Sequence, residues 1–108
     1  MSNLLIIGGA HVDRLARLKA PHRAHTSNPV EITEDVGGGC FNAGRAARRF
    51  AVNVSLLSAR GADAAGGLVD QAIKSAGITD VSSVHLDRAT PTYTAILAPD
   101  GEDRKSVV

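Results

Sequence analysis

The sequence has few aromatic residues and a single cysteine. Only 3% of its 108 residues are aromatic, and tryptophan is absent. A hydrophobic core for this chain must therefore be built mainly from Ala, Val, Leu and Ile. The lone cysteine, Cys40, excludes an internal disulfide and a cysteine-rich metal site. Such cysteine usage is typical of a reducing compartment, so we expect a cytoplasmic protein.

The sequence also lacks a charge excess and a long apolar run. Twelve basic and eleven acidic residues give a formal charge of +1. No nucleic-acid or membrane footprint follows from this balance. No apolar stretch approaches a bilayer's thickness, and the N-terminal "MSNLLIIGGAHVD" lacks the basic leader of a signal peptide. We therefore expect neither nucleic acid nor a membrane as a partner. The length suits one small domain.

Apolar runs predict the strands of a parallel sheet. Residues 4–7 form a continuous apolar run, typical of a strand buried on both faces. Residues 52–57 form the next such strand, and residues 81–86 a third. Two helical stripes alternate with these strands. The first comprises Ala43, Ala46, Ala47 and Phe50. The second comprises Leu68, Val69, Ala72, Ile73 and Ala76. Asp63 is the expected N-cap of the second helix, and Gly77 its end.

Other segments do not fit a sheet that is covered on both faces. Residues 20–29 form a loop, and residues 30–36 a half-exposed strand. Residues 92–97 are rich in β-forming residues and precede a turn at 99–101, with a returning arm from 107. We expect these strands to form a small antiparallel sheet beside an α/β fold. The sequence ends inside this arm, which indicates a truncated polypeptide.

The stretch "EDVGGGCFNAGRAARRF", residues 34–50, carries the clearest candidate for a binding site. Gly37, Gly38 and Gly39 would expose backbone N–H groups at a helix N-terminus, which favours electron-rich oxygens. Asn42 adds a donor and an acceptor in the first turn. This arrangement suits a polyhydroxylated ligand or an anion, but a tight structural turn without ligand explains the glycines equally well.

Two nucleotide-binding motifs are only partly matched. A phosphate-binding loop needs Lys and Ser or Thr where Arg45 and Ala46 stand. The dinucleotide fingerprint needs further glycines after "GGAHVD". Asp13 follows the first strand, where a carboxylate can bind two vicinal hydroxyls, although alone it is more simply a solvated aspartate. His11 reads as a polar loop residue, and we assign no metal to any histidine.

Four segments, taken in order, resemble the N-terminal part of the ribokinase-like (PfkB-type) carbohydrate and nucleoside kinases. They are "LLIIGGAHVD", "GGGCFN", "GADAAG" and "TPTYTAILAPDGEDR". The resemblance implies a three-layer α/β/α fold with a small β-sheet lid. Residues 3–10 and 37–87 would belong to the α/β part, and the lid strands would lie within 12–36 and 91–108. It implies six substrate-binding residues: Asp13, Gly37, Gly38, Gly39, Asn42 and His11.

Within this family the chain looks most similar to the pseudouridine kinases, on "SNP" at 27–29 and "TYTAILAPDGE". His11 stands where sugar-specific members often have Asn, and Gly39 where ribokinases often have Lys. Both departures leave room for a nucleoside substrate.

The resemblance further implies transfer of the ATP γ-phosphate to a primary hydroxyl, with magnesium present. The family's Gly-Ala-Gly-Asp segment, with its catalytic aspartate, is absent from this sequence, as is the ATP site. We therefore expect no catalytic residue in this chain, no activity from it alone, and an exposed sheet edge prone to pairing. A homodimer through the lid strands is expected from the family. Two alternatives remain: a non-catalytic fragment that binds ligand or self-associates, and an unrelated Rossmann-like nucleotide binder.

Overall fold

The structure is a computed structural model that describes residues 2–100 and 103–107. Its contacts divide the chain into two compact units. Unit 1 comprises Met1–Val12 and Val36–Pro91, and unit 2 comprises Asp13–Asp35 and Thr92–Val108. No helix among the described residues is long and apolar enough to cross a bilayer.

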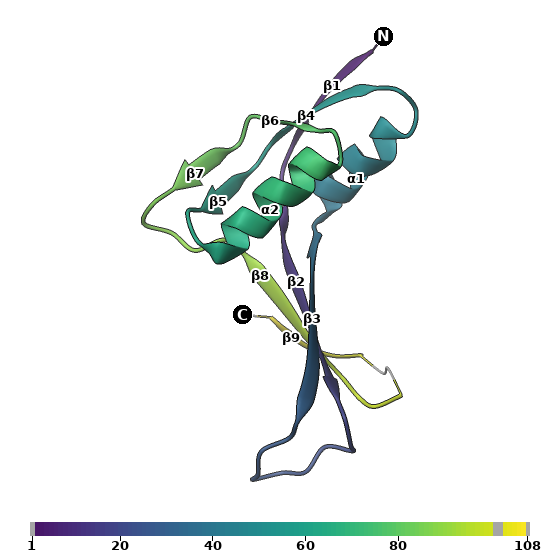
Figure 1. Cartoon of the computed structure of the whole chain (residues 1–108), viewed down its shortest axis with the longest axis vertical. Helices are drawn as coiled ribbons and strands as arrows, with labels where there is room; N and C mark the ends of the chain where they lie inside the picture. The colour runs from purple at the N-terminus through teal and green to yellow at the C-terminus, as the bar shows by residue number, and fades with distance from the viewer. Residues whose placement is uncertain (1, 101–102, 108) are drawn as a thin grey trace. The chain divides into compact units, whose positions relative to one another are not determined.

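A parallel sheet of three strands forms the centre of unit 1, in the order β1-β4-β6. The strands are β1 (Asn3–Ile7), β4 (Asn53–Leu57) and β6 (Thr79–Asp80). β1 and β4 pair along their whole length, from Asn3 opposite Asn53 to Ile7 opposite Leu57. Helix α1 (Gly39–Arg48) precedes β4, and helix α2 (Ala64–Ser75) follows it (Figure 1). This alternation confirms the predicted α/β character.

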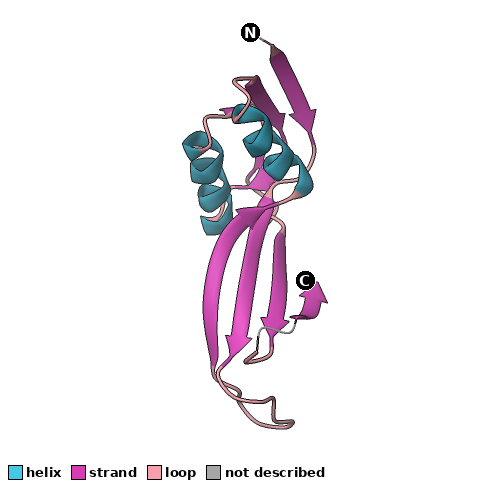
Figure 2. Cartoon of the chain, turned by 90° about the vertical axis from the view of Figure 1, so that its right-hand side faces the viewer, coloured by secondary structure: helices cyan, strands magenta, loops and turns pink. Residues whose placement is uncertain are grey.

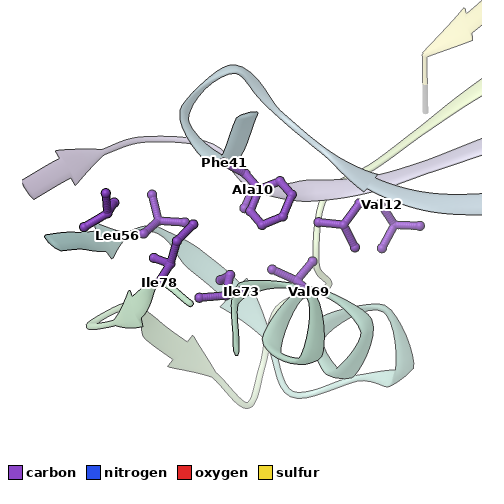
Figure 3. Close-up of a cluster of buried hydrophobic side chains, with 9 residues drawn as sticks. Ala10, Val12, Phe41, Leu56, Val69, Ile73 and Ile78 are labelled. Atoms are coloured by element: carbon purple, nitrogen blue, oxygen red, sulfur yellow. The ribbon is translucent and has the colours of Figure 1, made fainter. Parts of the chain in front are cut away.

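Both helices cover the same face of this sheet (Figure 2). Val54 and Leu56 alternate along β4 and are buried in one cluster with Phe41 of α1 and Ile73 of α2. The strands follow one another across the sheet in one direction, from β1 to β4 to β6. Because crossovers between parallel strands are right-handed, the two connecting helices lie on the same face of the sheet. The cluster as a whole is drawn in Figure 3 and consists of Ala10, Val12, Val36, Phe41, Val54, Leu56, Val69, Ile73 and Ile78.

The apolar run at 4–7 does form a strand, but the expectation that both of its faces are buried is wrong. Leu5 is 56% exposed and Ile7 is 68% exposed. Ile6, between them, packs against the core under α1. Successive strand side chains point to opposite faces, and within the described residues only the helix-bearing face of β1 is covered. β1 is also an end strand in the described order.

The core-facing side of helix α1 coincides only in part with the expected stripe. Phe41 and Gly44 are its buried residues, whereas Phe50 is 81% exposed and lies beyond its end. A Cβ on Gly44 would lie 3.2 Å from Ile78 Cδ1 and 3.3 Å from Val54 Cγ1. Because the glycine lets the helix approach the sheet this closely, the face around Gly44 is buried. Of the expected stripe, Ala47 packs against the core, whereas Ala43 and Ala46 are exposed.

Helix α2 begins and ends where the sequence predicted. Asp63 is the N-cap residue, and its side chain accepts a hydrogen bond from the Gly66 N–H. Gly77 follows the C-cap with φ of +73°, the left-handed conformation that favours glycine. Val69 and Ile73 of the predicted stripe are fully buried, but Leu68 is partly exposed.

The region expected as one strand at 81–86 is divided. The chain pairs with β4 through β6 and then, through β7 (Ser83–His85), with β5 (Ala59–Gly61) in a second parallel sheet. β5 has no periodic signal in the sequence, because it is only three residues long.

A four-stranded sheet in the order β3-β2-β8-β9 makes up most of unit 2, whereas the first two residues of β2 and the last two of β3 belong to unit 1. The strands are β2 (His11–Leu18), β3 (Val30–Gly37), β8 (Thr92–Leu97) and β9 (Asp103–Val107). β8 and β9 are antiparallel, with Leu97 opposite Asp103, so the predicted hairpin forms with a longer second arm. Gly101 and Val108 of that prediction lie outside the described residues. Periodicity did not single out β2, because Arg14 and Arg17 interrupt its apolar pattern.

Candidate functional site

A hollow of about 520 Å³ lies in unit 1, where the carboxyl ends of β1 and β4 meet. In open α/β sheets, ligands collect outside the carboxyl ends of parallel strands. We call this space the strand-end hollow. Its lining is Ile7, Gly8, Gly9, Ala10, His11, Leu57, Ser58, Ala59, Ser83 and Pro91. Spacing along the sequence could not identify Ser58, Ser83 or Pro91 as neighbours of His11, because only the sheet brings them together.

Gly38 is a glycine because the backbone packs tightly there. It is the N-cap residue of α1, with φ of +107°. A Cβ at Gly38 would lie 2.5 Å from the carbonyl oxygen of Gly9, which lines the strand-end hollow. The Phe41 N–H donates to that same carbonyl at 3.3 Å. The explanation of a tight structural turn therefore holds at this position.

Gly39 differs from its neighbour. A Cβ at Gly39 would meet no other atom within 4 Å, so open space adjoins its main chain. Gly39 is the first residue of α1, where N–H groups and the helix dipole attract electron-rich atoms. Here a ligand could reach the backbone. Gly37, the last residue of β3, is buried.

Asn42 lies in the first turn of α1 with its side chain held in one orientation. Its N–H donates to the Gly38 carbonyl at 2.9 Å. The Arg45 guanidinium donates to Asn42 Oδ1 at 3.0 Å and lies 5.2 Å from the centre of the Phe41 ring. Because a guanidinium only donates, the acceptor atom of the amide faces Arg45. The Nδ2 group is then the part of Asn42 suited to a ligand oxygen.

The remaining predicted site residues lie on β2. His11, its first residue, lines the strand-end hollow and is partly buried. Asp13 is two residues further along, is partly buried, and belongs to unit 2. Both side chains lie in a strand, so the interpretation of His11 as a loop residue is wrong.

The described residues contain no group of three or more His, Cys, Asp or Glu side chains that could hold a metal ion. These residues therefore do not fit a resident magnesium ion.

Comparison with known proteins identifies the family of this chain. All of residues 1–108 match the pfkB family of carbohydrate kinases. The chain belongs to this family. The unrelated Rossmann-like binder considered above is thereby excluded. A comparison with curated proteins gave no match.

Solved structures of pfkB relatives are similar over nearly the whole chain. A carbohydrate kinase from Agrobacterium tumefaciens is 41% identical over 95% of this chain, with a TM-score of 0.90. A putative sugar kinase from Clostridium perfringens is 32% identical over 100% of it, with a TM-score of 0.86. A ribokinase from Cryptococcus neoformans in complex with ADP is 25% identical, with a TM-score of 0.78 over 100% of this chain. The chain spans only 34%, 34% and 35% of these three proteins, respectively. The fold is thus the N-terminal portion of the ribokinase-like fold.

Proposed function

We propose that residues 1–108 form the substrate-binding part of an ATP-dependent sugar or nucleoside kinase that phosphorylates a primary hydroxyl. The observation that carries this proposal is the match of the whole chain to the pfkB family. The strand-end hollow and the open main chain at Gly39 support it, because they leave room for a ligand where α/β proteins commonly bind one.

Each proposed binding residue has a distinct chemical part. The Asp13 carboxylate would accept hydrogen bonds from two vicinal hydroxyls. Asn42 would donate from Nδ2, since Arg45 occupies Oδ1. The main chain at Gly37–Gly39 would approach the ligand's oxygens, with Gly39 the open position. His11 would lie at the wall of the strand-end hollow. In the proposal, unit 2 acts as the lid that excludes water during phosphoryl transfer.

A nucleoside is the favoured substrate, and pseudouridine is the first to test. The segments "SNP" at 27–29 and "TYTAILAPDGE" resemble pseudouridine kinases. His11 and Gly39 replace the Asn and Lys that are common in sugar-specific members. An aromatic or amide-bearing base would need the additional space that a glycine leaves.

ATP and magnesium are assigned to a part of such a kinase that this chain does not contain. When bound, they would supply the phosphoryl group and the charge that neutralises it. The chain lacks the Gly-Ala-Gly-Asp segment, so we assign no catalytic residue to it and expect no turnover from it alone. A cytoplasmic location suits a kinase that depends on ATP.

A chimera tests this function. Residues 1–108 would replace the matching N-terminal third of the Agrobacterium carbohydrate kinase, to which they are 41% identical. The product would be assayed with ATP and magnesium against pseudouridine, uridine, ribose and fructose phosphates. Asp13→Asn and Asn42→Ala should each lower kcat/KM by roughly tenfold or more, since a lost hydrogen bond to a substrate costs about 1–3 kcal/mol.

Matched controls separate binding from folding. Asp87→Asn changes an exposed aspartate, and Asn53→Ala lies at the amino end of β4, away from the strand-end hollow. Both should leave kcat/KM within about twofold, as is usual for surface changes. A folded chimera that phosphorylates none of the panel would overturn the proposed kinase function.

A second candidate is a non-catalytic fragment that binds ligand or self-associates. One observation favours it: Leu5 and Ile7 leave an apolar face of the parallel sheet uncovered among the described residues. The homodimer through the lid strands belongs to this candidate as well. Light scattering after size exclusion across a concentration range measures association, and calorimetric titration with pseudouridine measures binding. A monomer that binds no member of the panel would exclude it.

A further inference from the structure

The chain segment between β7 and β8 is fixed to the start of α2 by Asp63. This segment, residues 86–91, passes that end of the helix (Figure 1). The Thr90 hydroxyl donates to Asp63 Oδ1 at 2.6 Å, and the Thr90 N–H donates to Oδ2 at 3.0 Å. The same Oδ1 accepts from the Gly66 N–H at 2.8 Å. One carboxylate therefore caps the helix and holds the passing chain.

The Thr90 side chain makes further contacts that a helix cap alone would not need. Thr90 is only 4% exposed. Its Oγ1 accepts from the Gly61 N–H at 3.0 Å and lies 3.3 Å from the Gly61 carbonyl oxygen. Hydrogen bonds to a charged group are about twice as strong as neutral ones. We call the contacts of Thr90 with Asp63 and Gly61 the Asp63–Thr90 latch.

Two glycines allow the segment to lie this close. A Cβ on Gly61 would overlap the carbonyl oxygen of Arg88, and one on Gly66 would overlap the carbonyl oxygen of Gly61. The Gly-x-Asp-x-x-Gly pattern at Gly61, Asp63 and Gly66 therefore has a shared cause. All three residues shape one surface against which residues 88–90 pack.

The charge state of Asp63 suits this role. The hydrogen bonds from the Thr90 side chain, the Thr90 N–H and the Gly66 N–H lower the pKa of Asp63 from 3.8 to about 2. The carboxylate is thus ionised at neutral pH, where it is a strong acceptor.

The residue held in place by this arrangement is Pro91. It follows Thr90 directly and lines the strand-end hollow. Its carbonyl oxygen accepts from the Val12 N–H at 3.2 Å, next to His11 on the same wall. Pro91 is also the last residue of unit 1 before β8 begins at Thr92.

We propose that Asp63 and Thr90 are positioning residues that set the Pro91 wall of the strand-end hollow and the root of β8. Neither residue needs to touch the ligand, since both oxygens of Asp63 are already used within the protein. The inference rests on the proposed function only in treating the strand-end hollow as a substrate site. Loss of the latch should loosen Pro91 and raise the cost of ordering the site when ligand binds.

The latch can be tested in the 108-residue chain without any ligand. The readouts are amide hydrogen exchange at Val12, at residues 88–90 and at Thr92, and the fluorescence anisotropy of Tyr93. Tyr93 is the only tyrosine in a chain without tryptophan, and it lies in β8. Thr90→Val should speed exchange at Val12 and Thr92 by roughly tenfold or more, since local opening governs exchange, and should lower the Tyr93 anisotropy.

Three further variants distinguish the latch from a general loss of stability. Thr90→Ser keeps the hydroxyl and should restore slow exchange. Asp63→Asn keeps an acceptor for the Gly66 N–H but places an amide donor opposite the Thr90 N–H. It should therefore speed amide exchange at Val12, while circular dichroism should show that α2 is preserved. Thr79→Val is the matched control, because it replaces a threonine by valine at an exposed residue of β6. It should change neither the amide exchange nor the Tyr93 anisotropy.

The outcomes separate this inference from the proposed function. Unchanged exchange at Val12 in both Thr90→Val and Asp63→Asn would overturn the latch, whatever the chain binds. If Thr90→Val unfolds the chain, the exchange rate at Val12 in Asp63→Asn decides: unchanged exchange there would overturn the latch. Faster exchange at Val12 in the variants would support the latch. If the chimera at the same time had no kinase activity, the proposed function would be contradicted while the latch would stand. In an active chimera, Asp63→Asn should raise KM more than it lowers kcat.

Discussion

The two units differ in how their residues are held together. Unit 1 has a contiguous core of nine buried apolar residues drawn from its strands and both helices. In unit 2 the buried apolar residues among those described are Ala16, Leu18 and Ala95. Val30 and Ile32 of its sheet are exposed instead. Burying one Val, Leu or Ile side chain stabilises by about 1.5–3 kcal/mol. Unit 1 is therefore stabilised by packing, whereas unit 2 depends largely on strand pairing.

The largest effect should come from the centre of unit 1. Leu56 of β4 is fully buried, so Leu56→Ala should lower the free energy of unfolding by about 2–5 kcal/mol through lost burial and a cavity. Ile32→Ala in unit 2 should cost less than about 1 kcal/mol, because that side chain is 54% exposed. Urea unfolding followed by circular dichroism measures both.

Leu86→Ala is the matched control for Leu56→Ala. Leu86 is 92% exposed, and its replacement should change stability by no more than about 0.5 kcal/mol. Comparable losses from Leu56→Ala and Ile32→Ala would contradict the contrast between the units.

The second effect concerns a buried charge in unit 1. The Arg60 side chain is only 6% exposed, and its guanidinium donates to Asp80 Oδ2 at 2.6 Å and to Asp70 Oδ1 at 3.3 Å. Asp80→Asn should destabilise by about 3 kcal/mol, the low end for breaking a buried pair, because Asp70 remains. Lys74→Ala removes only the exposed partner of Asp70 and should cost less than about 1 kcal/mol.

Acid titration gives an independent measurement of this pair. Burial alone would raise the pKa of Asp80, but hydrogen bonds from Arg60 and Ser82 outweigh it and hold the pKa below its ordinary value of 3.8. The carboxylate therefore stabilises the fold above that ordinary value, and the contribution is lost as the pH falls through the lower, folded-state pKa. Urea midpoints between about pH 5 and pH 2 should fall less steeply in Asp80→Asn. Equal slopes would argue against the pair.

A third effect distinguishes two adjacent glycines. Gly38→Ala would place a Cβ against Gly9 at a positive φ, and should destabilise unit 1 by about 1–3 kcal/mol. Gly39→Ala has open space and no positive φ, so it should be neutral or stabilise the helix by about 0.4–1 kcal/mol. Thermal unfolding of both variants tests this. In the active chimera, Gly39→Ala should nevertheless raise KM, because its methyl group would occupy the ligand's approach.

The helices show what the sequence could specify about the fold. α2 was predicted with its ends because Asp63 and Gly77 have local chemistry that caps a helix. α1 was predicted to exist, but only Ala47 of its predicted apolar stripe packs against the core. Its alanines form a regular stripe, whereas the close approach of Gly44 to Val54 depends on the sheet. Local signals therefore located the helix, and tertiary contacts decided which face is buried.

The candidate site divides in the same way. The glycine run and Asn42 were visible because several unusual residues are adjacent in the sequence. The contact between Asn42 and Arg45 had a usable signal, since residues three apart are neighbours on a helix. No signal in the sequence predicts that Gly9, Ser58 and Pro91 line the same hollow. Their proximity depends on how β1, β4 and the segment after β7 are arranged.

The smallest predicted effect tests whether charge pairing compensates for the thin core of unit 2. Arg14 of β2 and Glu34 of β3 approach to 3.8 Å, and their side chains are 47% and 39% exposed. Exposed pairs contribute about 0.2–1 kcal/mol and are screened by salt. A double-mutant cycle of Arg14→Ala and Glu34→Ala should therefore give less than about 0.5 kcal/mol, falling further at high salt. A coupling above about 1.5 kcal/mol, well beyond exposed pairs, would mean that unit 2 relies on side-chain electrostatics. Strand pairing would then no longer account for the stability of unit 2. The two units would instead differ in the side-chain contacts that stabilise them, with apolar packing in unit 1 and charge pairing in unit 2.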